Sequence, residues 1–94
     1  MAYTLSFSKK FFEDLEKHKK SGQQKLLAKI EKFLSECMDN PKIGTGHPEQ
    51  LKFHTDETWS RRIDQKHRLV YKIDELKNPK EVFILSAWGH YDDK

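Results

Sequence analysis

The pattern of hydrophobic positions changes along this chain, from a helical period in its first half to a strand period in its second. At the start, Tyr3, Leu5 and Phe7 alternate with small or polar residues, which predicts a short strand with one buried face. Ser8 then provides a helix cap, and apolar residues between 11 and 15 form one stripe. A strand followed by an amphipathic helix is therefore expected at the N-terminus.

A second helix is predicted after Ser21-Gly22, which interrupts the helical pattern. Ser21 and Gln24 match the spacing of a capping box. The apolar positions expected on its buried face are Leu26, Leu27, Ile30, Phe33, Leu34 and Cys37. Asn40-Pro41 ends the helical half, so the two helices are expected to form a hairpin.

Strands are predicted in the second half of the chain. A loop rich in glycine and proline at 44–48 leads into 51–53, and alternating runs follow at 59–64, 68–73 and 82–88. Because the strands cluster after the helices, we predict an α+β fold of order βααββββ. Its two N-terminal helices pack on one face of a mainly antiparallel sheet. The other face is then available for a site.

Composition limits the class of protein. The 94 residues suit one domain over 1–94 with a thin core, and the net charge of +3 is too small to require a polyanionic partner. A single cysteine, Cys37, excludes an internal disulfide and a cysteine-based zinc cluster. With no signal peptide and no membrane-spanning run, a cytoplasmic location without membrane attachment is expected. Lysines and acids alternate through the helical half, which predicts a solvated surface without a catalytic role.

All three arginines lie between 59 and 71, which points to planar, bidentate recognition of phosphate oxygens. Strand alternation separates Arg62 from Arg61, and Arg62 and Arg68 converge outside the core if their strands pair suitably. A one-residue slip would reverse every side chain, so the sequence does not fix this register. For Arg61, contact with ribosomal RNA and contact with an acidic side chain both stay open.

Four motifs, in chain order, resemble the YoeB/Txe family of toxins. They are Gly-x-Gly-x-Pro-Glu-x-Leu-Lys at 44–52, Trp-Ser-Arg-Arg-Ile at 59–63, His-Arg-Leu-Val-Tyr at 67–71 and Gly-His-Tyr at 89–91. The resemblance implies a RelE-like fold and the toxin of a type II toxin-antitoxin system. Such a toxin enters the ribosomal A site and cleaves messenger RNA without a cofactor. It also implies inhibition of translation, and neutralisation by a YefM-like antitoxin encoded next to the toxin, and it leaves a homodimer open.

The resemblance also implies roles for six residues. By motif position, Glu49 is the general base and His90 the general acid, with Arg68 as the third catalytic residue. The residues expected to bind phosphate or substrate are Lys52, Arg62 and Tyr91. The chain departs from the family in its last three residues, 92–94, and in its first helix, which is rich in phenylalanine and lysine.

This set of side chains fits RNA cleavage by the substrate's own 2'-hydroxyl. That reaction needs a base, an acid and cations for the charge that grows on phosphate, and it needs neither metal nor water. No histidine pair in the chain has convincing metal spacing with a third ligand, and no phosphate-binding glycine loop precedes a helix. The histidines expected simply to be exposed are His18, His47, His54 and His67, the last also supporting the hairpin beside Arg68.

Two other classes of function stay open. One is a non-catalytic toxin on the same scaffold, like the relatives that poison topoisomerases. The other is a simple RNA-binding module, which has no reaction to lose when Glu49 is replaced. Taken alone, Glu49 is an ordinary loop glutamate, and the combination with the arginines and His90 favours the nuclease.

Overall fold

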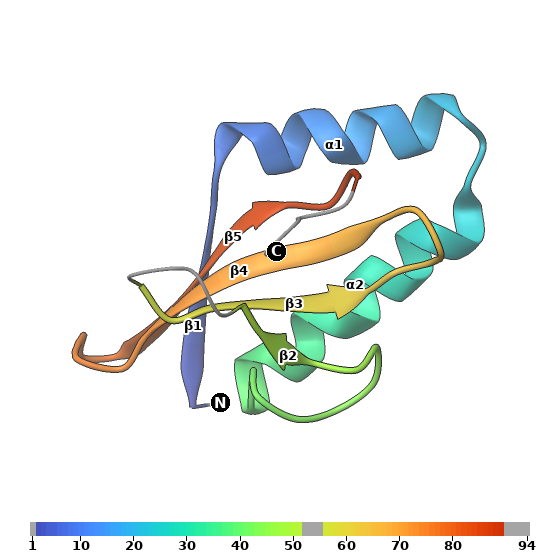
Figure 1. The fold of residues 1–94 in the computed structure, drawn as a ribbon. Coiled ribbons are helices and arrows are strands. Elements are labelled where there is room, and N and C mark those ends of the chain that lie inside the picture. Colours follow the sequence, from blue (N-terminus) through green and yellow to red (C-terminus); the bar gives the residue numbers. More distant parts are fainter. Residues whose placement is uncertain (1, 52–55, 90–94) are drawn as a thin grey trace.

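The computed structural model describes residues 2–51 and 56–89 (Figure 1). Its elements are β1 (Tyr3–Phe7), α1 (Lys9–Lys20), α2 (Gln24–Asp39), β2 (Glu49–Gln50), β3 (Thr58–Arg62), β4 (Arg68–Asp74) and β5 (Lys80–Ser86). The predicted order βααββββ is confirmed.

The strands form one sheet in the order β1-β5-β4-β3-β2. β1 runs parallel to β5, and every other neighbouring pair is antiparallel. Both helices cover the same face of this sheet, so the predicted α+β architecture is confirmed (Figure 1). We call the other side, which carries no helix, the open face.

The hydrophobic core lies between the helices and the sheet. Phe11 of α1 and Phe33 of α2 pack against Leu69 and Tyr71 of β4, all nearly inaccessible to solvent. Cys37 is also buried in this cluster, and burial raises the pKa of its thiol to about 11. Of the apolar stripe predicted for the second helix, all but Leu27 lie in this core or pack against it. No helix among the described residues is long and apolar enough to span a membrane.

The turn between the helices differs from the prediction. Ser8 does cap α1, since its hydroxyl accepts the Phe11 N–H at 3.1 Å. Ser21, however, ends α1 instead of starting α2, and the N-cap of α2 is Gln23, which makes no side-chain capping bond. Gly22 adopts a left-handed conformation with φ of 69°, which closes α1 in the way glycine commonly closes helices. The predicted capping box of Ser21 and Gln24 is therefore wrong.

Arg61 is a structural residue buried behind the sheet. Its guanidinium lies 2.5 Å from a carboxylate oxygen of Glu36 and donates to the Tyr71 hydroxyl. It also donates to three backbone carbonyls, those of Asn40, Ile43 and Thr45. The sequence left open whether Arg61 contacts ribosomal RNA or an acidic side chain, and the structure shows contact with the acidic side chain of Glu36. The buried arginine thus ties the 40–45 loop to α2 and β4.

We expect Gly46→Ala to lower the free energy of unfolding by about 1–3 kcal/mol more than Gly22→Ala, as measured by urea denaturation. Both glycines have positive φ, 83° and 69°, so both replacements strain the backbone. A Cβ at Gly46 would lie 2.5 Å from the buried Phe33 ring, whereas one at Gly22 meets nothing within 4 Å. Equal losses in the two variants would contradict this packing argument.

Candidate active site on the open face of the sheet

The centre of the candidate site is a pair of arginines on adjacent strands. In the β3–β4 register Arg62 lies directly opposite Arg68, so their Cβ atoms are about 4.5–5.5 Å apart. Trp59 and Arg61 face the helices, and alternation therefore places Arg62 on the open face. The predicted convergence of the two arginines outside the core is confirmed.

This arrangement is electrostatically unfavourable unless an anion is present. Like charges directly opposite on neighbouring strands repel. Among the described residues, no acidic side chain forms an ion pair with Arg62 or Arg68, although six other pairs are formed. Two adjacent guanidinium groups that form no ion pair with a carboxylate in the described part of the chain suit a phosphate group.

Glu49 lies on the same face beside Arg62. It pairs with Ser60 in the β2–β3 register and is therefore diagonal to Arg62, within reach of a long side chain. A shallow hollow of about 400 Å³ is lined by His47, Pro48, Glu49 and Arg62. The prediction that Glu49 lies in a loop is wrong. It belongs to the two-residue strand β2, which pairs with β3. An exposed carboxylate and an exposed guanidinium thus share one hollow.

Ser60 is a residue of this region that sequence analysis missed. Alternation puts it on the open face between Glu49 and Val70, where it is fully buried. Its hydroxyl has no hydrogen-bond partner among the described residues. What marks this serine is a buried hydroxyl oxygen without a partner among the described residues. Burial and pairing are visible only in the structure, so the sequence alone does not distinguish it from an ordinary strand residue.

The segment that follows β5 is bonded to the backbone of Arg68. A bulge shifts the β4–β5 register between Val70 and Tyr71, and bulges of this kind redirect the strand that follows. The Arg68 N–H donates to the Gly89 carbonyl at 3.1 Å, and the Gly89 N–H donates to Nδ1 of His67 at 2.9 Å. Gly89 is therefore fixed beside Arg68. His67 supports the hairpin end, as predicted, but it is half-buried and not exposed.

Helix α1 holds the same segment from the other side. The Ala87 N–H donates to the buried Asp14 carboxylate at 2.9 Å, and Nε2 of His18 donates to the Ala87 carbonyl at 2.8 Å. The rings of His18, His67 and Trp88 pack together, with centroids 4.4–4.9 Å apart. The prediction that His18 is exposed is wrong, because it is fully buried against this segment.

Three of the six predicted site residues can be placed. Glu49, Arg62 and Arg68 lie together on the open face. Lys52, His90 and Tyr91 lie outside the described residues, and so does His54. His90 is the next residue after the anchored Gly89.

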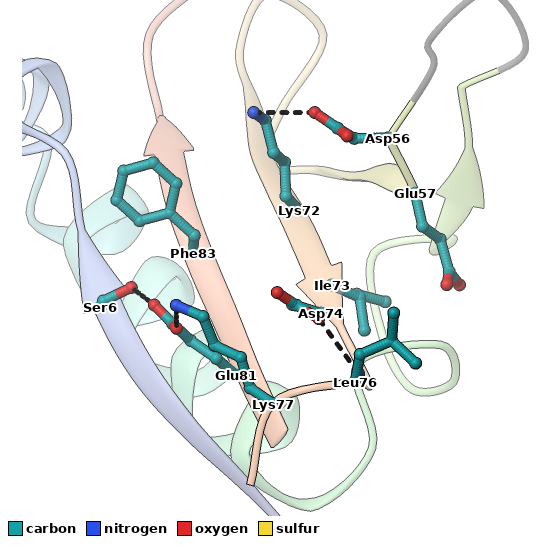
Figure 2. Close-up of a pocket in the computed structure, with 10 residues that line it drawn as sticks. All are labelled: Ser6, Asp56, Glu57, Lys72, Ile73, Asp74, Leu76, Lys77, Glu81 and Phe83. Carbon is teal, nitrogen blue, oxygen red and sulfur yellow. Dashed lines mark hydrogen bonds and ion pairs between the residues drawn. The ribbon is translucent and has the colours of Figure 1, made fainter. Parts of the chain in front are cut away.

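A second hollow on the open face, about 730 Å³ in volume, lies toward the other end of β4 and β5 (Figure 2). Its charges are neutralised internally. Lys72 pairs with Asp56 at 3.1 Å, and Glu81 accepts bonds from both Lys77 and Ser6. Because its cations already have partners, this larger hollow is a poorer phosphate site than the arginine pair.

No group of three or more metal-binding side chains is assembled among residues 2–51 and 56–89. The described part of the site offers two cations and a carboxylate, Arg62, Arg68 and Glu49.

Comparison with known proteins identifies the family. The model of the YoeB-like toxin of bacterial type II toxin-antitoxin systems matches residues 7–91. The chain belongs to this family.

Relatives of the YoeB-like family align over most of their length. Toxin YoeB of Streptomyces coelicolor is 33% identical over 87 residues, covering 93% of this chain and 98% of the relative. A YoeB dimer from Staphylococcus aureus superposes with a TM-score of 0.77 at 32% identity, covering 97% of this chain and 100% of that one. A heterotetrameric YoeB-YefM complex from the same organism gives 0.74 at 33% identity, with the same coverage.

Proposed function

We propose that this YoeB-like toxin is an endoribonuclease that cleaves messenger RNA in the ribosomal A site and thereby inhibits translation. The observation that carries the proposal is the cross-strand pair of Arg62 and Arg68, with Glu49 in the adjoining hollow. A topoisomerase poison or a plain RNA-binding module has no need of a carboxylate beside two such cations.

The proposed reaction uses the substrate's own nucleophile. Glu49 removes the proton from a ribose 2'-hydroxyl, and the 2'-oxygen forms a bond to the adjacent phosphorus. The bond from phosphorus to the 5'-oxygen breaks, and His90 donates a proton to that leaving oxygen. The products are a 2',3'-cyclic phosphate and a 5'-hydroxyl, so no water is consumed and no metal ion is required.

Arg62 and Arg68 act on the charge that grows on the phosphate during this reaction. The β3–β4 pairing fixes their backbone positions next to each other before the substrate arrives, which lowers the reorganisation needed when the charge develops. Lys52 adds positive charge and Tyr91 holds the substrate by stacking or by a hydrogen bond. The hydrogen bond between Arg68 and Gly89 supports placing His90 next to the same phosphate.

The exposure of Glu49 fits a reaction that depends on the ribosome. A positioned base or acid is worth about 10²–10⁴-fold in rate, and only when the substrate is held in line. An open, shallow hollow gives little such control. The ribosome would supply the alignment of the messenger strand.

The proposal extends to the protein partners of this toxin. The Staphylococcus aureus YoeB-YefM complex supports a YefM-like antitoxin, encoded next to this toxin, and the YoeB dimer supports self-association. The toxin acts in the cytoplasm, where ribosomes and messenger RNA are found, and residues 1–94 work as one domain without a cofactor.

The direct test is cleavage of a messenger positioned in the A site of a programmed ribosome. The wild-type protein is expected to yield 2',3'-cyclic phosphate and 5'-hydroxyl ends, identified by end-group analysis. A single 2'-deoxy nucleotide at the cleaved position should stop the reaction, because it removes the nucleophile. Cleavage that survives this change would exclude the proposed chemistry.

A variant that lacks the proposed acid separates the other functions. His90→Gln is expected to lower the cleavage rate about 10²–10⁴-fold. Intact messenger with damaged DNA in cells that express the toxin would instead support the topoisomerase poison. Toxicity that persists unchanged in both His90→Gln and Glu49→Gln would support the RNA-binding module.

A further inference from the structure

Three lysines of α2 form a stripe on one side of the helix. Lys25, Lys29 and Lys32 are spaced at i, i+4 and i+7, which places them on one face, and all three are exposed. They line a hollow of about 750 Å³ that His47 and Arg62 also line. We call these three residues the α2 lysine stripe.

The α2 lysine stripe keeps its positive charge unpaired within residues 2–51 and 56–89. None of its lysines forms an ion pair among the described residues, and Lys25 and Lys29 repel each other as like charges one turn apart. Glu36, the acid one turn after Lys32, is instead engaged by Arg61 and Thr45.

The acidic residue lining the hollow within the described part of the chain is Asp64. Its carboxylate accepts the backbone N–H groups of Lys66 at 2.8 Å and His67 at 2.7 Å, which fixes the β3–β4 turn. One carboxylate therefore faces four cations, Arg62 included. An excess of positive charge that repels itself is expected to attract a polyanion.

The hollow lined by the α2 lysine stripe adjoins the candidate active site. His47 and Arg62 line both this hollow and the smaller one that contains Glu49. A strand with one phosphate at Arg62 and Arg68 can therefore continue past Arg62 toward Lys29 and Lys32, along a hollow in which cations outnumber the carboxylate of Asp64. Single-stranded nucleic acids commonly follow such cationic grooves.

We propose that the α2 lysine stripe is a second phosphate-binding subsite, which holds the backbone of the same RNA strand beside the scissile phosphate. The inference rests on the proposed nuclease function, since it extends the path of the substrate. The exposure of these three lysines agrees with the predicted solvated surface, and the proposal adds a binding role to it. The contacts are to phosphates, so the subsite adds affinity without base specificity.

The experiment measures how binding of an uncleavable RNA depends on salt. The probe is a fluorescent, fully 2'-O-methylated RNA of about 12 nucleotides, a length suited to single-strand grooves. For the variant Lys29→Gln/Lys32→Gln, the slope of log K against log salt concentration is expected to be about 1.4 less steep than for the wild type. Each lost contact to a single strand contributes about 0.7.

The matched control is Lys9→Gln/Lys20→Gln. It removes the same charge from exposed positions on α1, on the side of that helix away from the buried Phe11 and His18. Its slope should equal that of the wild type. Equal slopes for both double variants would overturn the subsite. It would also be overturned if Lys29→Gln/Lys32→Gln weakened binding to purified ribosomes but not to the oligonucleotide.

The two proposals fail separately. Because the probe cannot be cleaved, binding through the α2 lysine stripe by a protein that cuts no messenger would disprove only the nuclease. Cleavage of messenger combined with an unchanged slope would disprove only the subsite.

Discussion

Arg68→Ala is expected to lower messenger cleavage about 10²–10³-fold, the loss typical when one preorganised donor to a developing oxyanion is removed. The same change should alter the free energy of unfolding by less than about 1 kcal/mol, because it also relieves the repulsion between Arg68 and Arg62. A large loss of rate with almost no loss of stability is what distinguishes a substrate-binding cation from a structural one.

The measurement pairs single-turnover cleavage on programmed ribosomes with urea denaturation of the same samples. Arg68→Lys keeps the charge but loses the planar fork, so its rate should fall between those of the wild type and Arg68→Ala. Lys9→Ala, an exposed lysine on α1, removes one charge elsewhere and should cleave normally. Full activity in Arg68→Ala would remove the basis for placing the scissile phosphate at the arginine pair.

Arg61→Ala is expected to lower the free energy of unfolding by about 3–5 kcal/mol, since it leaves the partners of a buried cation unsatisfied. Glu36 loses its ion pair, the Tyr71 hydroxyl loses a donor, and the carbonyls of the 40–45 loop lose theirs. Domains of this kind are stable by only about 5–15 kcal/mol, so much of the folded population is at risk.

Arg62→Ala is the matched control, because it removes the same side chain from the adjacent position. Arg62 is exposed and makes no ion pair among the described residues, so its loss should change stability by about 0.5 kcal/mol or less. Thermal or urea unfolding of the two variants decides the matter. If both variants lost a similar amount of stability, Arg61 would be no more structural than Arg62.

Acid should weaken the network of hydrogen bonds and the ion pair around Arg61 and Glu36. Desolvation raises the pKa of Glu36, but hydrogen bonds from Thr45 and the charge of Arg61 outweigh it and hold this pKa below its usual value. The resulting stabilisation is therefore present above the unfolded-state pKa of about 4.3 and is lost as pH falls through the folded-state value. Glu36→Gln should lack this part of the acid dependence.

Local patterns in the sequence were sufficient for much of the fold. Strand alternation, the apolar stripes of the helices and the Asn40-Pro41 stop predicted the element order and the sheet face that carries the helices. The errors came where two local signals compete. Ser21 fits a helix start by spacing, yet the left-handed Gly22 makes it the end of α1. The two-residue strand at Glu49 depends on pairing with β3, which has no local signal.

For the candidate site, the sequence by itself determined which side chains are available: two arginines separated by strand alternation from a third, a glutamate before them and a histidine after them. Only the tertiary structure decided how the three arginines are arranged. Register sets Arg62 opposite Arg68, and burial commits Arg61 to Glu36. Packing of α2 beside the 45–47 loop aligns the lysine stripe with Arg62. The physical reason is that charge and periodicity are local properties of a chain, whereas pairing and burial depend on residues far apart in sequence.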